Sequence, residues 1–423
     1  MRYVIRSENG LGLNLSKPFQ KSTLKGINMK TGTLFAEWDP KPEFKLGTKD
    51  IEGKLTYLGS KVWRQPHIKL VEKDMPVPGP TEVLIEVKAC GICGSDVHML
   101  QSDDSGYIFY PGLTAFPSTL GHEFSGVVVE AGKDVINKRT GRSYEAGEAV
   151  CSEEMIWCAQ CKPCADGFPN HCERLEELGF SIDGAYGKYV KVDARYVWSL
   201  EGLRAPYGEE KMFELGSLVE PTSVAFNAVI ERGGGIRAGE NVVILGGGPI
   251  GAAACAVLKR SGASAVILSE PSQSRREMAL TMGATHAIDP TEVSAAEAVL
   301  DITNGVGARI ILEATGLPSI VWPDVERIIW EGRALNTTVV LVARADDRIP
   351  LNGEVLQVRR ANVVGSQGHS GHGTFPNVIS CMAAGMDVSP MITKRIGLDE
   401  VEENLVMLQT DRNEVKITIK DFD

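Results

Sequence analysis

The chain has 423 residues, of which 43% are hydrophobic and 23% are charged, and its formal net charge is −11. This length exceeds one ordinary hydrophobic core, so two domains are expected, and the composition is typical of a soluble globular protein. The acidic balance argues against broad nucleic-acid binding, which needs a basic surface.

The sequence predicts a protein of the cytoplasm. Its N-terminus has no apolar core followed by a small-residue cleavage site, so no signal peptide is expected. The uncharged run 241–258 approaches membrane-spanning length, but GGGP interrupts it, which favours strand, turn and helix over a membrane span. Residues 1–28 show no clear period and are interpreted as a flexible extension.

A possible metal site follows two predicted strands, 62–70 and 82–90, which the turn-forming sequence PVPGP separates. The segment GICGSDVH then holds four functional side chains within six residues: Cys93, Ser95, Asp96 and His98. GHEFSG adds His122 and Glu123 before another strand. A cysteine, a histidine and an acid suit Zn²⁺ with an open position for substrate. Taken alone, Cys93 could be a buried small residue and His122 a core histidine.

A second cysteine cluster lies in a segment rich in Gly, Pro and charge. It has the spacing C-x2-C-x2-C-x7-C and comprises Cys158, Cys161, Cys164 and Cys172. Four thiolates without another ligand type form a closed tetrahedral site, which is the structural kind of zinc site. An iron–sulfur cluster also uses four cysteines, but no Cys-Pro follows here, so zinc is favoured.

An acid interrupts the apolar segment 215–229, which is predicted to be helical around Glu220 and Pro221. Burying a carboxylate there is costly unless it is paired or bound to metal. Glu220 is therefore a candidate metal ligand, either direct or through water. The alternative is a charge at a helix N-terminus beside Pro221.

The stretch 241–270 carries a dinucleotide-binding pattern. An apolar strand at 242–245 precedes a G-x-G-x-x-G turn formed by Gly246, Gly248 and Gly251, and an alanine-rich helix pattern follows from Ala252. Such glycines allow a tight turn and close approach to a pyrophosphate at the helix N-terminus.

An acid follows the second strand of this unit, predicted at 265–268. Glu270 lies nineteen residues after Gly251, where its carboxylate can accept hydrogen bonds from ribose hydroxyls. The same carboxylate would repel a 2′-phosphate, so NAD is favoured over NADP. Arg275 could contact the adenosine end of the cofactor or lie on a solvated helix face.

The alternation of strands and helices continues after Glu270. Helices are expected at 272–282 and 295–302 and further strands at 286–288, 309–314, 338–343 and 361–364, which gives six strands in a doubly wound parallel α/β sheet. A helix at 375–386 and a strand at 415–419 are expected to return to the first domain. His369 and His372, in SQGHSGHG, could touch phosphate or substrate. The residues expected to bind the cofactor are Gly246, Gly248, Ile250, Gly251, Glu270, Arg275, Val342, Ser366 and Gln367.

Taken together, GICGSDVH, GHE, the four spaced cysteines and GGGPIG with its distal acid resemble the zinc-dependent medium-chain dehydrogenases. The resemblance covers about residue 29 to the C-terminus. It implies a GroES-like β-rich catalytic domain at 29–226, a Rossmann NAD-binding domain at 227–366, and a return to the catalytic domain at 367–423. Family habit also implies a homo-oligomer, either a dimer or a tetramer.

The resemblance also implies roles for individual residues. Cys93 and His122 match the ligands of the catalytic zinc, while Glu123 and Glu220 match the acids that complete this site in the polyol and threonine branches. The residues that match the remaining functional positions are Asp96 behind the ligating histidine, Ser95 and His98 in the proton relay, and Cys158, Cys161, Cys164 and Cys172 around the structural zinc.

Three loops narrow the expected substrate. WDPKPEFKLGTKDIEGKL, GYIFYPGLTAFP and GSQGHSGHGTFP resemble a branch that oxidises a cyclic keto-polyol of inositol catabolism with NAD. The insertion at 101–118 is expected to supply polar partners for the substrate's hydroxyls. Alternatives are a sorbitol or L-threonine dehydrogenase with the same zinc chemistry. A zinc-less, quinone-reductase-like protein and a crystallin-like, NADPH-binding structural protein are further alternatives, which Cys93, His122 and Glu270 disfavour.

Overall fold

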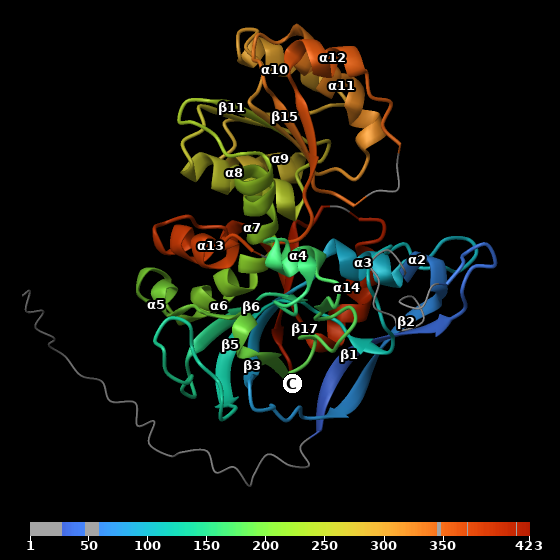
Figure 1. Ribbon diagram of the computed structural model, residues 1–423, viewed down its shortest axis with the longest axis vertical. Coiled ribbons are helices and arrows are strands. Elements are labelled where there is room, and N and C mark those ends of the chain that lie inside the picture. The colour runs from blue at the N-terminus through green and yellow to red at the C-terminus, as the bar shows by residue number, and fades with distance from the viewer. Residues whose placement is uncertain (1–27, 47–58, 345–347, 370, 412) are drawn as a thin grey trace, which may run out of the picture.

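A computed structural model describes residues 28–46, 59–344, 348–369, 371–411 and 413–423. Figure 1 shows a part built on β11 and β15 above a β-rich part that contains β3, β5 and β17. The predicted extension at 1–28 lies outside the described residues except for Asn28, which begins strand β1.

The upper part is a six-stranded parallel sheet in the order β13-β12-β11-β14-β15-β16, which confirms the predicted doubly wound fold. Its strands are short and mostly buried on both faces, as apolar runs in parallel sheets should be. Their bounds are β11 Asn241–Leu245, β12 Ala265–Ser269, β13 His286–Ile288, β14 Ile310–Glu313, β15 Thr338–Leu341 and β16 Asn362–Gly365.

Alternate residues of these strands bury against different helices, because successive side chains of a strand point to opposite faces. Val243 and Ile311 share a core with α10–α12, whereas Val242 and Leu312 share one with α8. Figure 1 shows these helix groups on either side of the sheet. The helices are α8 Pro249–Arg260, α9 Gln273–Thr281, α10 Ala295–Ile302, α11 Pro318–Glu331 and α12 Gly353–Arg359.

Helices α11 and α12 were not predicted from the sequence. Proline stands at the start of α11 and again inside it at Pro323, which masks the helical pattern. The apolar face of α11 is nevertheless clear in the structure, where Trp322, Val325 and Ile329 are buried against the sheet.

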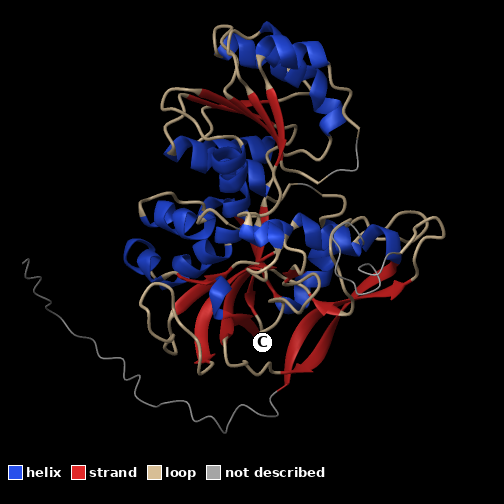
Figure 2. Ribbon diagram, viewed as in Figure 1, coloured by secondary structure: helices blue, strands red, loops and turns tan. Residues whose placement is uncertain are grey.

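The lower part is organised around a mixed sheet in the order β10-β6-β5-β3-β18-β17, with β9 also paired to β3. Figure 2 shows these strands gathered below the helices. Their bounds are β3 Glu82–Gly91, β5 Glu123–Ala131, β6 Ala149–Ser152, β9 Tyr189–Asp193, β10 Val197–Ser199, β17 Ile392–Gly397 and β18 Lys416–Asp421. The strand expected at 415–419 is β18, and β17 was not predicted.

Smaller sheets flank this core. One has the order β2-β1-β4 and the other pairs β7 with β8. Their bounds are β1 Asn28–Trp38, β2 Trp63–Asp74, β4 Ser118–Thr119, β7 Met155–Ile156 and β8 Glu176–Glu177.

Helices of the lower part lie between the two sheets and around the β-rich core (Figure 2). They are α2 Gly59–Val62, α3 Gly94–Leu100, α4 Lys162–Ala165, α5 Glu201–Tyr207, α6 Glu209–Ser217, α7 Val219–Phe226, α13 Thr374–Ala383 and α14 Val401–Met407. Short 3₁₀ segments are η1 Pro169–His171, η2 Ala194–Tyr196, η4 Ser389–Met391 and η5 Leu398–Glu400.

The segment predicted as one helix at 215–229 is helical around Glu220 and Pro221, but it is divided at Leu218 and changes to a π-helix after Phe226. The chain forms α6, then α7, and continues from α7 into the π-helix η3 Asn227–Arg232. The predicted domain boundary between 226 and 227 therefore falls inside one continuous helical run.

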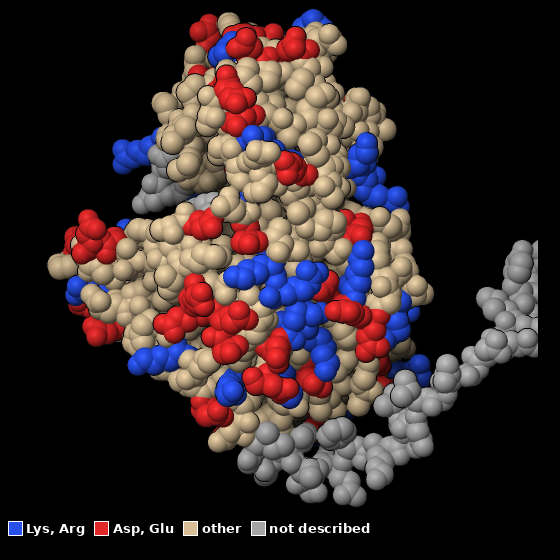
Figure 3. Space-filling view, turned by 180° about the vertical axis from the view of Figure 1, so that it is seen from behind, with Lys and Arg blue, Asp and Glu red and all other residues tan. Residues whose placement is uncertain are grey.

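On the face shown in Figure 3, basic and acidic side chains lie beside one another. Within the described part of the chain, no helix combines the length and apolarity needed to cross a membrane.

Candidate active site

Strand pairing assembles the predicted zinc site. Cys93 caps the N-terminus of α3 directly after β3, and Glu123 begins β5, where it pairs with Gly91 of β3. Ligand atoms of Cys93, His122 and Glu123 lie within 4.8 Å of one another, and His122 and Glu123 are almost fully buried. One thiol, one imidazole and one carboxylate fit a zinc site with an open position. We refer to these three residues as the Cys93 group.

Asp96 lies behind the Cys93 group. Its Oδ1 is 3.6 Å from Nδ1 of His122, which leaves the other ring nitrogen, Nε2, for a metal. Its Oδ2 accepts hydrogen bonds from the Cys93 backbone N–H at 2.9 Å and the Tyr186 hydroxyl at 3.0 Å. Burial raises the pKa of Asp96, while His122 and these hydrogen bonds oppose the rise. Tyr186 was not predicted as a site residue.

The predicted proton relay lies on α3. The Oγ of Ser95 is 3.7 Å from the Sγ of Cys93, so the hydroxyl borders the predicted metal site. His98 is one helical turn later on the same helix face as Ser95. Its carbonyl accepts a hydrogen bond from the backbone N–H of Tyr110 at 3.1 Å, which ties the relay helix to the 101–118 insertion.

Glu123 is held by a lysine that the sequence analysis missed. The Nζ of Lys416, on β18, donates to both carboxylate oxygens of Glu123 at 2.7 and 2.6 Å and to the Ile92 carbonyl at 2.9 Å. Burial lowers the pKa of Lys416, but Glu123 outweighs it and the pKa is raised. The signal in the sequence was a lysine at a buried position of the apolar strand VKITI.

Glu220 lies in a different cluster from the one predicted. Its ligand atom groups with those of Glu154 and His369, and its Oε1 is 3.7 Å from His369 Nε2. His369 Nε2 also contacts the Glu154 carboxylate. Burial lowers the pKa of His369, but the two carboxylates raise it to about 9, so the ring is charged at neutral pH. The charges of Glu123 and Lys416 also affect the pKa of Glu220. The cluster of Glu154, Glu220 and His369 is therefore a neighbour of the Cys93 group.

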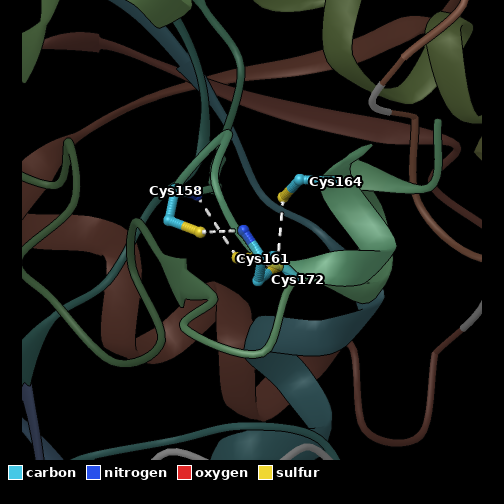
Figure 4. A group of neighbouring side chains, drawn as sticks. All are labelled: Cys158, Cys161, Cys164 and Cys172. Carbon is cyan, nitrogen blue, oxygen red and sulfur yellow. Dashed lines mark hydrogen bonds between the residues drawn. The ribbon is translucent and has the colours of Figure 1, made fainter. Parts of the chain in front are cut away.

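The four cysteines of the second cluster converge (Figure 4). Their sulfur atoms lie within 4.8 Å of one another, and none is in a disulfide. Backbone N–H groups point at these sulfurs, including those of Gln160 and Cys161 at Cys158. Those two donors lower the pKa of Cys158 to about 6, which favours a thiolate. The donor set and its compactness fit a tetrahedral zinc ion.

The glycine turn has little room for side chains. Gly246 has φ of 102°, and a Cβ on Gly251 would lie 1.9 Å from the Gly246 carbonyl oxygen. Gly248 caps the N-terminus of α8, and Ile250 is in the first turn of that helix. The glycines thus allow the helix N-terminus to pack against the turn.

Glu270 follows β12 and contacts the same turn. Its carboxylate accepts from the backbone N–H of Gly247 at 2.7 Å and of Ser272 at 2.9 Å. A carboxylate has about four acceptor positions, so two remain for ribose hydroxyls. Arg275 instead donates to the Glu414 carbonyl at 2.9 Å, which connects α9 to the segment before β18.

The other predicted cofactor residues follow the last two strands of the parallel sheet. Val342 follows β15, and the Ser366 backbone N–H donates to Leu341 at the end of that strand. The Gln367 carbonyl accepts from Asn170 of the cysteine-rich segment at 2.9 Å. These residues share the carboxyl edge of the sheet with the glycine turn, where cofactors bind in this fold.

Two family comparisons cover most of the chain. Residues 79–202 match the alcohol dehydrogenase GroES-like domain, and residues 249–384 match the zinc-binding dehydrogenase family. The chain is 64% identical over 392 residues to scyllo-inosose 3-dehydrogenase from Thermotoga maritima, covering 92% of this chain and 99% of that relative. It is 32% identical over 342 residues to L-threonine 3-dehydrogenase from Caldanaerobacter subterraneus subsp. tengcongensis, covering 80% and 91%.

Solved structures of dehydrogenases are also similar to this chain. A protein from Thermotoga maritima assigned as an alcohol dehydrogenase superposes with a TM-score of 0.90 at 63% identity, covering 93% of this chain and all of that chain. A protein from Sinorhizobium meliloti 1021 assigned as a zinc-binding dehydrogenase, and bound to NADP, has a TM-score of 0.72 at 28% identity, covering 84% and 96%.

Proposed function

Since the chain belongs to the zinc-binding dehydrogenases that carry an alcohol dehydrogenase GroES-like domain, we propose that it oxidises scyllo-inosose with NAD. The product would be a diketo-inositol. The observation that carries the chemistry is the Cys93 group, in which His122 and Glu123 are buried and Cys93 is partly exposed, with Asp96 behind it. The substrate is supported by the 64% identical relative and by the three loops of the sequence analysis.

The Cys93 group fits a catalytic zinc ion, and the four-cysteine cluster fits a structural one. When bound, zinc supplies a Lewis acid that lowers the pKa of the substrate hydroxyl, and NAD supplies the acceptor for the carbinol hydride. Asp96 orients the His122 ring, and Lys416 fixes the carboxylate of Glu123. Glu220 belongs to the neighbouring cluster with Glu154 and His369. We therefore propose that it binds the catalytic zinc only when it replaces Glu123 as a ligand.

The proton of the substrate hydroxyl leaves through α3. The Ser95 hydroxyl lies 3.7 Å from the Cys93 sulfur and so borders the position that a metal-bound substrate would occupy. Ser95 would accept the proton there, and His98 would pass it towards solvent. The glycine turn and the N-terminus of α8 hold the pyrophosphate, and Glu270 accepts hydrogen bonds from the adenosine ribose hydroxyls.

We also propose that the protein is located in the cytoplasm and that it forms a homodimer or a homotetramer.

A substrate panel tests the proposed function. Zinc-replete protein is offered scyllo-inosose, myo-inositol, sorbitol and L-threonine, each with NAD, and NADH formation is followed by absorbance. We expect turnover confined to scyllo-inosose, because myo-inositol lacks the ring ketone and sorbitol and L-threonine are acyclic. Turnover on threonine or sorbitol instead would retain the zinc chemistry and reject the cyclitol substrate. Threonine is the second candidate because of the 32% identical relative.

Cofactor choice gives a separate prediction at Glu270. The wild type should have a kcat/KM for NAD at least about 100-fold above that for NADP, because a buried carboxylate repels the 2′-phosphate. Glu270→Gln should lower this ratio at least about tenfold. Glu277→Gln on the exposed face of α9 is the control and should leave the ratio unchanged. Equal use of both cofactors by the wild type would contradict the assignment.

A further inference from the structure

A buried polar cluster next to the Cys93 group has no role in the proposed chemistry. Glu177, on β8, lies opposite Met155 of β7, and the neighbouring Leu178 N–H donates to the Glu154 carbonyl at 3.0 Å. The charges of Glu154, Arg344 and His369 all act on the Glu177 carboxyl, so these groups are close to it.

The cluster includes residues from both parts of the protein. Arg344 follows β15 of the parallel sheet, and its guanidinium lies 5.3 Å from the centre of the Tyr110 ring, in the 101–118 insertion. Gly112 makes this contact possible, because a Cβ there would lie 2.2 Å from Arg344 Nη1 and 2.6 Å from the Tyr110 hydroxyl. The hydroxyl and the guanidinium therefore meet over Gly112.

Glu177 carries an unsatisfied polar atom. The residue is 4% exposed, and among the described residues its Oε2 has no hydrogen-bond partner. Buried polar atoms are almost always hydrogen-bonded, since leaving one unpaired costs free energy. Burial and the charge of Glu154 raise the pKa of Glu177 to about 8, although the positive charges of Arg344 and His369 lower it. At neutral pH this carboxyl is mostly protonated, so it can donate as well as accept, which complements a hydroxyl.

One aromatic side chain separates this cluster from the predicted zinc ligand. The Phe180 ring lies 4.6 Å from the His122 ring and 5.2 Å from the Tyr110 ring, centre to centre. Phe180 belongs to the turn that Glu177 begins, and its N–H donates to the Glu177 carbonyl at 3.1 Å. Tyr110 and Glu177 therefore lie next to Phe180, one side chain away from the predicted zinc ligand His122.

We propose that Glu177, with Tyr110 and Arg344, forms a subsite that binds ring hydroxyls of the cyclic polyol remote from the oxidised carbon. This inference rests on the proposed function. A ring with a hydroxyl on nearly every carbon must satisfy each of them on leaving water, and Glu177 offers a buried carboxyl oxygen, Oε2, that has no hydrogen-bond partner among the described residues. The subsite thus selects a polyhydroxylated ring over a plain cyclic alcohol of the same size.

The test compares scyllo-inosose with cyclohexanol, both with saturating NAD. Glu177→Leu should lower kcat/KM for scyllo-inosose about 10- to 100-fold, mainly through KM, because a hydrogen bond made in the ground state is lost. It should leave kcat/KM for cyclohexanol within about threefold. Glu177→Gln, which retains a donor and an acceptor, should recover most of the loss. Glu176→Leu, one residue earlier on β8, is the matched control and should behave as wild type with both alcohols.

Thermal unfolding separates binding from a structural role. Without substrate, Glu177→Leu should not lower Tm and should raise it by about 1–3 °C, because it removes an unsatisfied buried carboxyl. An equal loss of activity on both alcohols, or a fall in Tm with unchanged selectivity, would overturn the subsite while the proposed function stands. If the wild type does not oxidise scyllo-inosose, the proposed function fails and the subsite falls with it.

Discussion

Replacing His122 with alanine is expected to lower kcat/KM at least about 1000-fold, because the Lewis acid contributes several kcal/mol to the barrier. His122 is buried between Asp96 and the Phe180 ring, and it is the only imidazole of the Cys93 group in the described structure. Metal analysis of the purified variant should show zinc falling from two ions per chain to one, because the four-cysteine cluster is untouched.

The same variant should bind NADH as the wild type does, within about twofold by fluorescence, because none of the glycine-turn contacts involves His122. His171→Ala provides the control, since His171 is exposed beside Cys172. It should retain both zinc ions and full activity. A His122→Ala protein with wild-type turnover would rule out the zinc mechanism.

The second large effect is expected on stability. Lys416→Met should lower the free energy of unfolding by about 3–5 kcal/mol, because it leaves the buried Glu123 carboxylate without its partner. Both side chains are 1% exposed, so solvent cannot replace the lost ion pair. Urea unfolding followed by tryptophan fluorescence measures the change.

Two further variants test the cause. Lys420→Met, on the same strand, removes a lysine that is 22% exposed and 3.7 Å from Glu214, and it should cost less than about 1 kcal/mol. Adding Glu123→Gln to Lys416→Met should recover part of the lost stability, because the unpaired charge is then gone. If Lys416→Met and Lys420→Met cost the same, the buried pair is not what stabilises this strand.

Sequence motifs alone predicted the family and the fold, and they identified the residues of the Cys93 group. Family membership, the parallel sheet and the dehydrogenase class followed from motifs and are confirmed by the comparisons and the strand order. The ligand roles of Cys93 and His122 remain predictions, although strand pairing brings the two residues together.

What the sequence determined by itself was local. The glycine turn, the buried strand of 242–245 and the four spaced cysteines each lie within a short stretch, where backbone sterics and ligand spacing dictate the outcome. Secondary structure between these motifs followed where apolar periodicity was clean, as in α10, and failed where proline masked it, as in α11.

Only the tertiary structure decided which charged groups meet. Glu123 and Lys416 are 293 residues apart in sequence, and Glu154 and His369 are 215 apart. Glu220 was predicted from its position inside an apolar segment, but its neighbour His369 comes from a loop after the last parallel strand. Such contacts depend on how whole sheets pack, since a buried charge needs a partner and the sequence does not say which distant residue provides it.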